Sequence, residues 1–340
     1  MKKTKIVFTI LGVIIAAILI VGGIFVYRTQ QSLNALNTGD KSVSKKIDNS
    51  KPFSILLLGA DTGTDGRVDR GNSDTMMLLT LNPKKKKTVA YSIPRDALAE
   101  MVGDKKKNVQ KINAAYNIGL STMAKKTVGN LLGVPVDYHV AINMEALEKT
   151  VDFVGGVTVT SDLKVSFNGV TIPKGTHHLN GKQALTYARM RYQDPRGDYG
   201  RQLRQQQVLK AVIKKLEEPK YLVKVPDLIK KLGNDINTDL TTSQIDQIVL
   251  KYHNSTKTMD FNQIQGQTAW INDSSYQILP TTTIQNASNK LRENLELEPK
   301  TLNNTETKLN AKNRAFFKNE DDTNYDTYGL DTTYYTNNTY

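Results

Sequence analysis

The feature that most constrains this chain is an uncharged apolar run near its N-terminus, IVFTILGVIIAAILIVGGIFVY at positions 6–27. As a helix rising 1.5 Å per residue, these 22 residues span a hydrocarbon layer of roughly 30 Å. Lys2, Lys3 and Lys5 precede the run, and clustered lysines keep the adjacent end of a membrane helix in the cytoplasm. We therefore predict a single-pass anchor in the cell membrane, with residues 1–5 cytoplasmic and the remaining chain extracellular.

A cleaved signal peptide is the alternative for this run. Its apolar stretch exceeds the usual signal-peptide core of about 7 to 15 residues, and no small-residue cleavage site follows it cleanly. Residues 28–51 are polar and predict a stalk. A folded domain is expected over 52–284. The rest, 285–340, is rich in Asn, Thr, Asp and Tyr and predicts a low-complexity, disordered tail.

Composition limits the chemistry that the domain can carry. The net charge of +13 favours anionic partners such as nucleic acid, anionic lipid or a phosphate-bearing polymer. Because cysteine is absent, thiol nucleophiles, thiolate zinc sites and disulfides are excluded. The sequence has no P-loop, G-x-S-x-G or H-E-x-x-H motif, and its four histidines lack zinc-site spacing.

The pattern of apolar residues and turn signals predicts a layered α/β domain. Strands are expected at 53–61, 74–82, 88–94, 136–142 and 157–161, with a hairpin joining the second and third. Helices are expected near 111–119 and at 121–132, 144–153 and 240–252, with a short one after Asn180 and a longer one from about 198 to 218. Further strands are expected within 267–280.

Arginines gather in the segment RMRYQDPRGDYGRQLRQQQ, residues 189–207. Arg189 and Arg191 leave the same face of an extended segment, and Arg201, Arg204 and Gln205 share one face of a helix. Guanidinium groups bind phosphate oxygens bidentately, and a helix start near Asp198 adds free N–H groups. The alternative is a solvated basic helix start paired with nearby acids. Spacing alone leaves both interpretations open.

Two aspartates flank the segment between the first two strands. Asp61 ends the first strand and Asp74 opens the second, so both side chains are expected at one rim of the sheet, where ligands of open α/β folds bind. Two carboxylates and a phosphate make a suitable Mg²⁺ site. Plain turn chemistry is the alternative for this pair. Arg95 and Asp96 follow the third strand, directly after Pro94.

Several motifs, taken in order, are similar to those of one family. The sequence carries LLLGAD, RGNSDTMMLLTLNP, YSIPRD, KINAAYNIG, FVGGVTV, LNGKQALTYARMR and GDYGRQLRQQQ after its apolar run. In this order they resemble the LytR-CpsA-Psr family of Gram-positive envelope proteins. The resemblance implies a central mixed β-sheet sandwiched between helices, with an apolar lipid pocket and a charged mouth.

The resemblance also implies an activity, which is transfer of an anionic glycopolymer from an undecaprenyl-pyrophosphate carrier to peptidoglycan. Wall teichoic acid, capsular polysaccharide and other wall polymers are candidate substrates. It implies Mg²⁺, or alternatively Mn²⁺, at Asp61 and Asp74. The residues it implies for pyrophosphate binding or catalysis are Arg95, Arg189, Arg191, Arg201 and Gln205, supported by Asp198, Arg204 and Arg70. Arg196 is expected to be solvated.

One departure from the family concerns the loop before Asp74. Members often carry an arginine two residues before this aspartate, where the chain has Asn72; Arg70 is a candidate replacement. Asp96 and Asp198 are the candidates for a general base. Two other functions stay open, a non-catalytic module that binds envelope polymer and a transcriptional regulator. The extracellular topology and the lack of a DNA-reading motif argue against nucleic acid as a partner.

Overall fold

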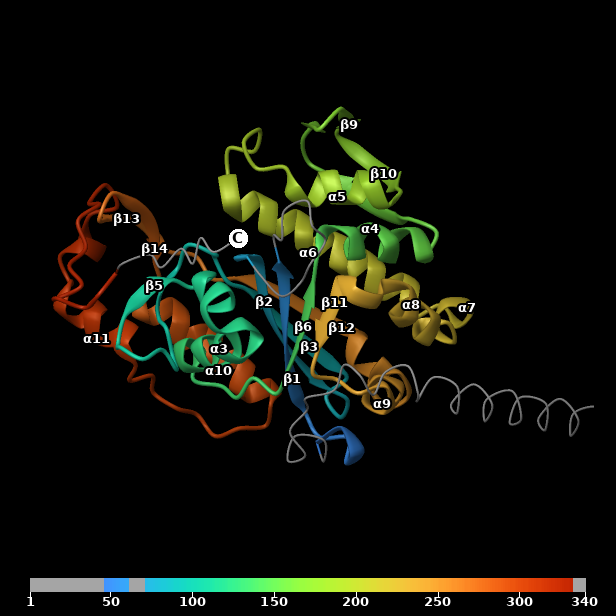
Figure 1. Ribbon diagram of the computed structural model, residues 1–340, viewed down its shortest axis with the longest axis horizontal. Coiled ribbons are helices and arrows are strands. Elements are labelled where there is room, and N and C mark those ends of the chain that lie inside the picture. Colours follow the sequence, from blue (N-terminus) through green and yellow to red (C-terminus); the bar gives the residue numbers. More distant parts are fainter. Residues whose placement is uncertain (1–45, 61–70, 333–340) are drawn as a thin grey trace, which may run out of the picture.

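The computed structural model describes residues 46–60 and 71–332. At its centre lies a six-stranded mixed sheet in the order β11-β6-β1-β2-β3-β12 (Figure 1). The strands are β1 (Phe53–Ala60), β2 (Ser73–Asn82), β3 (Lys87–Ser92), β6 (Tyr138–Ile142), β11 (Ile236–Thr238) and β12 (Thr258–Gln263). β6 runs parallel to β1 and β12 parallel to β3, whereas the other pairs are antiparallel. The predicted layered α/β class and the hairpin between β2 and β3 are confirmed.

One face of the sheet packs against α3 (Ala114–Leu132) and α10 (Thr281–Asn294). Leu56, Leu58 and Leu78 of the strands share a core with Leu131 of α3 and Leu291 of α10. The structure joins the two helices predicted at 111–119 and 121–132 into one element. Its backbone is non-helical at Gly119 and at Leu120, where φ is 52°. The predicted break is therefore a kink within α3.

The opposite face is covered by α6 (Gly197–Leu216), α4 (Met144–Phe153) and α8 (Val225–Leu232). Next to them lie α5 (Gly181–Arg189), α7 (Pro219–Leu222) and α9 (Thr242–Tyr252). Two small hairpins pack on α5 and α6, one pairing β7 (Val157–Ser161) with β10 (Gly175–Leu179) and one pairing β8 (Val165–Phe167) with β9 (Val170–Ile172). Val157, Leu179, Tyr187 and Val208 form the second core between them.

The segment after 284 is folded rather than disordered, which corrects the predicted tail. α10 continues to Asn294, α11 spans Thr305–Lys312, and the described chain runs to 332. The segment packs against the hairpin of β13 (Gln267–Ile271) and β14 (Ser274–Ile278), which is separate from the central sheet, and near β4 (Leu98–Glu100) and β5 (Val109–Lys111). The physical reason is a sparse set of buried apolar side chains, Leu291, Leu295, Leu302, Leu309, Phe316 and Tyr325.

The N-terminal predictions fall mostly outside the described residues. The expected anchor at 6–27 and the stalk up to residue 45 lie there. No helix of the part that the structure describes is long and apolar enough to span a membrane. The last residues of the expected stalk belong to the domain, because Ile47 is fully buried against Phe53, Tyr138 and Tyr252.

Candidate active site

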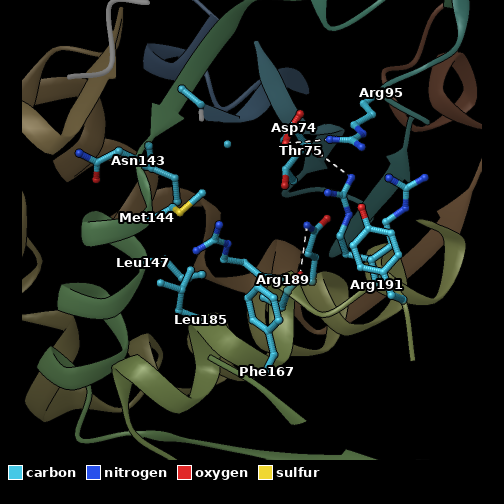
Figure 2. A pocket seen from close by; sticks show the side chains of 17 residues that line it. Asp74, Thr75, Arg95, Asn143, Met144, Leu147, Phe167, Leu185, Arg189 and Arg191 are labelled. Atoms are coloured by element: carbon cyan, nitrogen blue, oxygen red, sulfur yellow. Dashed lines mark hydrogen bonds and ion pairs between the residues drawn. The ribbon is translucent and has the colours of Figure 1, made fainter. Parts of the chain in front are cut away.

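A cavity of about 240 Å³ lies where β1 and β6 end. One wall is cationic and contains Arg95, Arg191 and Arg201, with Asp74 as the carboxylate lining it among the described residues, and Arg189 lines the cavity farther from Asp74. Figure 2 shows Arg95 reaching Asp74, whereas the Arg189 side chain lies on the side of Met144 and Leu147. Apolar side chains form the rest of the lining and surround the Arg189 side chain; they are Ile142, Met144, Leu147, Phe167, Leu185 and Ala188. The cavity can therefore hold a molecule with a strongly anionic part and an apolar part.

The sheet positions Asp74 at this cavity. The antiparallel pairing of β1 with β2 extends as far as Ala60 and Ser73, with an irregularity in register between Gly59 and Ala60. A side chain at Gly59 would bring its Cβ within 2.9 Å of Cβ of Thr75, so the close approach of the two strands here requires glycine. Asp74 and Thr75 both line the cavity as a result.

Arg95 is fixed by carboxylates at the end of β3. Its Nη1 lies 2.8 Å from Oδ2 of Asp74, and its Nε lies 3.5 Å from Oδ2 of Asp96. Burial lowers the pKa of Arg95, but the charges of Asp74 and Asp96 outweigh burial and raise this pKa above its usual value. Arg95 is thus a firmly charged group at the mouth.

Arg201 is the most buried cation of the cavity and is incompletely paired. Its Nη2 lies 2.6 Å from Oδ1 of Asp198 and donates a 3.0 Å hydrogen bond to the Asp74 carbonyl oxygen. Its buried Nε has no hydrogen-bond partner among the described residues. Burial lowers the pKa of Arg201, and the nearby charges of Arg95 and Arg191 lower it further against the opposing effect of Asp198 and Asp74. An anion in the cavity would relieve this repulsion.

Arg189 and Arg191 contact rings instead of acids. The guanidinium of Arg189, the last residue of α5, lies 5.7 Å from the centre of the Phe167 ring, and that of Arg191 lies 5.7 Å from the Tyr192 ring. Within residues 46–60 and 71–332, neither has a carboxylate oxygen within 4.0 Å. Gln205 also lines the cavity. These cations are available to a ligand.

The structure places Arg204 and Arg196 differently from the predictions. Arg204 is only 2% exposed and does not line the cavity, because its Nη1 pairs with Oδ2 of Asp194 at 2.5 Å and its Nε donates to the Tyr187 carbonyl oxygen. It supports the fold beneath the cavity and is not presented to an anion there. Arg196 is not simply solvated, since it pairs with Asp194 and Asp162, each at 2.8 Å.

The predicted metal pair can be followed only in part. Asp61 and Arg70 lie outside the described residues, so the structure does not place either of them. Asp74 is described and lines the cavity. In the described ranges, no three or more histidine or acidic side chains are close enough together to hold a metal ion. Three points therefore stay predictions. They are Mg²⁺ at Asp61 and Asp74, Mn²⁺ as the alternative ion, and Arg70 in the role of the arginine that family members often carry at the position of Asn72.

Motifs and residue spacing predicted the charged residues of the site but not the apolar part of its lining. Met144 and Leu147 are one turn apart on α4 and face the cavity, whereas Ala146 and Val151 of the same helix are buried in the fold. A second apolar face on a short helix is the signal that could have indicated a lipid-facing surface. Only the family resemblance implied such a pocket.

Comparison with known proteins identifies the family of this chain. Residues 23–293 match the LytR_cpsA_psr family, and the chain belongs to this family. A relative from Bacillus cereus strain AH820 is 40% identical over 306 residues, covering 87% of this chain and 99% of its own; it is named polyisoprenyl-teichoic acid–peptidoglycan teichoic acid transferase TagU.

Two solved structures show the same architecture. Protein gbs0355 from Streptococcus agalactiae aligns with a TM-score of 0.71 and 37% identity, over 76% of this chain and 93% of its own. A structure described as TagT bound to LI-WTA aligns with a TM-score of 0.61 and 29% identity, over 73% of this chain and 92% of its own. The mixed central sheet between helices is therefore the architecture of solved relatives.

Proposed function

We propose that this chain is a membrane-anchored transferase that moves an anionic glycopolymer from an undecaprenyl-pyrophosphate carrier to peptidoglycan. The observation that carries the proposal is a single cavity that is lined by four arginines and by a set of apolar side chains. A polyprenyl pyrophosphate has a matching anionic head and apolar chain. The relatives named as teichoic acid transferases support the reaction class. They also favour wall teichoic acid over capsular polysaccharide as the polymer.

The proposed reaction is phosphoryl transfer to a sugar hydroxyl. The acceptor oxygen forms a bond to the phosphorus that carries the glycopolymer, and the bond from this phosphorus to the bridging oxygen breaks. The electron pair stays on that oxygen, so the lipid leaves as its monophosphate, and the hydroxyl proton passes to a base or to water. Such reactions require mainly positioning and stabilisation of charge on phosphate oxygens.

The cavity arginines supply this stabilisation in the proposed reaction. Arg189 and Arg191, which lack carboxylate partners in the described chain, hold the pyrophosphate oxygens. Arg201 sits deeper and has a free Nε donor for the charge that develops on the leaving oxygen. Gln205 contributes a neutral hydrogen-bond donor. Asp198 holds Arg201 in place through their 2.6 Å ion pair.

Mg²⁺ is part of the proposal, with Mn²⁺ as the alternative. Asp74 fits the role of a ligand because it offers carboxylate oxygens at the cationic wall and its side chain is partly open to solvent. Asp61 would be the second ligand. When bound, the ion would neutralise negative charge on the diphosphate. The anchor at 6–27 would keep this cavity near the membrane surface, outside the cell, where a polyprenyl carrier is anchored.

The test is an in vitro transfer assay with the full-length protein in detergent, a polyprenyl-pyrophosphate saccharide and a peptidoglycan acceptor. We expect Arg189→Ala and Asp74→Asn to lower transfer strongly. The matched control is Arg314→Ala, because Arg314 is exposed and lies away from the cavity. EDTA should abolish transfer, and added Mg²⁺ should restore it.

Two outcomes would decide against the proposal. Wild-type activity in Arg189→Ala and Asp74→Asn would mean that the cavity is not the catalytic site. Donor binding without any transfer by the wild-type protein, with Mg²⁺ present, would instead favour the non-catalytic polymer-binding module.

A further inference from the structure

A second cavity of about 270 Å³ adjoins the first, and Arg191 lines both. Its floor includes Pro94 and Asp96 after β3, and Asp198 and Tyr199 in the first turn of α6. Its far wall is the β13–β14 hairpin, which contributes Thr268, Ser275 and Gln277. The carboxylate of Asp198 connects the two cavities, because it lines the second and pairs with Arg201 of the first.

The second cavity differs from the first in charge. Its charged lining is already largely paired: Asp96 lies near Arg95 and Lys111, Asp198 pairs with Arg201, and Arg196 pairs with Asp194 and Asp162, which leaves Arg191 as the one lining cation without a carboxylate partner in the described chain. A strongly anionic polymer would meet these carboxylates without a surplus of positive charge. A neutral ligand rich in hydroxyl groups fits better, since carboxylates accept hydrogen bonds from hydroxyls.

The polar side chains of this cavity are held in a fixed network. Tyr199 donates from its hydroxyl to Oε1 of Gln277 at 2.8 Å and accepts from the backbone N–H of Gly266 at 2.8 Å. Gln277 in turn donates to Oγ1 of Thr268 at 2.9 Å. A site whose hydrogen-bonding groups are already oriented loses little side-chain entropy on binding a ligand.

Trp270 stands on the same face of the hairpin as the cavity-lining residues. Trp270 pairs with Ser275, and Thr268 pairs with Gln277, in the antiparallel register. Directly opposed residues and residues two apart in a strand share one face of a sheet. The other face, with Ala269, Ile271 and Tyr276, is buried. Trp270 is the only tryptophan of the chain, and 57% of it is exposed.

The geometry points to a binding site for a neutral saccharide, formed by this second cavity and the Trp270 ring. This inference rests on the proposed function, in which the saccharide belongs to the acceptor that supplies the attacking hydroxyl. Pyranose rings present a C–H face to an indole ring and hydroxyl groups to a polar cavity, and the hairpin offers both on one face. Arg191 and Asp198 place this site directly beside the pyrophosphate.

A fluorescence titration tests the inference directly, because Trp270 is the single tryptophan. The full-length wild-type protein is titrated with a tetrasaccharide of β-1,4-linked N-acetylglucosamine, and tryptophan emission is recorded. We expect a saturable change in emission, retained in Arg189→Ala, since Arg189 lines the first cavity and not the second. No change in emission would overturn the inference. A change with glycerol phosphate but none with the tetrasaccharide would also overturn it and would assign the site to the donor polymer.

Kinetics then separate this inference from the proposed function. Trp270→Ala should raise the KM for the acceptor about two- to tenfold, and leave the KM for the lipid donor unchanged. Trp270→Phe, which keeps a ring, should restore most of the acceptor KM. Leu250→Ala is the control, because Leu250 of α9 is another exposed large apolar side chain and lines neither cavity.

Failure of the saccharide-site inference and failure of the proposed function would give different results. If the wild type transfers polymer and Trp270→Ala has an unchanged acceptor KM, the saccharide site is wrong and the proposed function stands. If the wild type does not transfer at all, the proposed function fails, and the fluorescence titration alone decides whether the saccharide site exists.

Discussion

Five arginines between residues 189 and 204 divide into two groups that serve different purposes. Arg189, Arg191 and Arg201, the cavity arginines, line the cavity. Arg196 and Arg204, the scaffold arginines, both pair with Asp194. Asp194 is buried, with 4% exposure, and accepts from both guanidinium groups and from the Arg196 backbone N–H. The two groups are interleaved in sequence, yet only one is free for a ligand.

The difference between the groups shows that charge balance, more than residue type, marks an anion site. Burial alone would raise the pKa of Asp194, but hydrogen bonds from Arg196 and Arg204 lower it well below its usual range. The pKa of Arg201 is lowered instead, because burial and neighbouring cations outweigh its acidic partners. The scaffold group is electrostatically complete, whereas the cavity group requires an anion to become so.

The largest expected effect concerns the scaffold group. Asp194→Ala leaves the Arg204 guanidinium buried without a carboxylate, so we expect the free energy of unfolding to fall by about 3–5 kcal/mol. Urea denaturation measures this loss. The control is Asp162→Ala, which removes only the exposed partner of Arg196 and should cost less than about 1 kcal/mol. Equal losses in the two variants would show that Asp194 is not the central partner.

The next effect concerns the cavity group and should appear in activity rather than stability. Arg201→Ala removes one donor to the developing phosphate charge, so kcat should fall by about 10²- to 10³-fold. The free energy of unfolding should fall by less than in Asp194→Ala, since relief of repulsion with Arg95 and Arg191 offsets part of the lost Asp198 pair. Inorganic pyrophosphate should raise the Tm of the wild type more than that of the variant, which keeps Arg189 and Arg191. A strongly lowered Tm in Arg201→Ala would move Arg201 into the scaffold group.

The sequence could not divide the arginines in this way. Arg201 and Arg204 are three residues apart and were expected on one helix face, but three helical steps leave about 60° between them. This rotation is enough to put Arg201 at the cavity and Arg204 beneath it. Arg95, Arg189 and Arg191 do line the cavity, but spacing alone left their role open and the family resemblance assigned them. The extended segment expected for Arg189 and Arg191 is wrong, because Arg189 is the last residue of helix α5.

Local sequence patterns also predicted only part of the fold, because some elements depend on contacts with distant parts of the chain. α4 and β7 lie where the sequence predicted them, since strong patterns and clear turn residues bound both. The edge strands β11 and β12 were missed because they are short or polar and depend on pairing with β6 and β3. The segment after 284 was misjudged for a related reason. Its apolar residues are too sparse to show a period, but they pack on cores built by distant parts of the chain.

A third, smaller effect is expected from pH. Asp239 resembles Asp194 in neutralising cations, since it pairs with Lys125 and accepts from the His139 backbone N–H. Burial would raise the pKa of Asp239, but hydrogen bonds from His139 and Lys125 lower this pKa to about 2. A lowered folded-state pKa means that the stabilisation is present above the unfolded pKa near 4 and is lost as pH falls toward 2.

Unfolding in urea between pH 5 and 2 tests this effect. The wild type should lose about 2 kcal/mol more than Asp239→Asn over this window. The cavity arginines stay protonated throughout and should add no pH dependence of their own. Identical pH profiles for the wild type and Asp239→Asn would contradict the assigned pairing.

The smallest expected effect tests how rigidly Asp194 is held. In α6, Gly200 faces Asp194 so closely that a Cβ there would lie 2.0 Å from Oδ2 of this aspartate. Alanine usually stabilises a helix interior by about 1 kcal/mol relative to glycine. Because the scaffold arginines fix Asp194, the collision should outweigh this gain, so Gly200→Ala should lower the free energy of unfolding by about 1–2 kcal/mol.

The same substitution should change sign when the carboxylate is removed. In the Asp194→Ala background the added methyl group has room, so Gly200→Ala should be neutral or stabilise by up to about 1 kcal/mol. The two substitutions would then show a favourable coupling in a double-mutant cycle measured by urea denaturation. Strict additivity would mean that Asp194 moves aside freely. The scaffold arginines and Asp194 would then not form a rigid support that presents Arg201 to the cavity. The cavity arginines and the scaffold arginines would differ only in whether their side chains line the cavity.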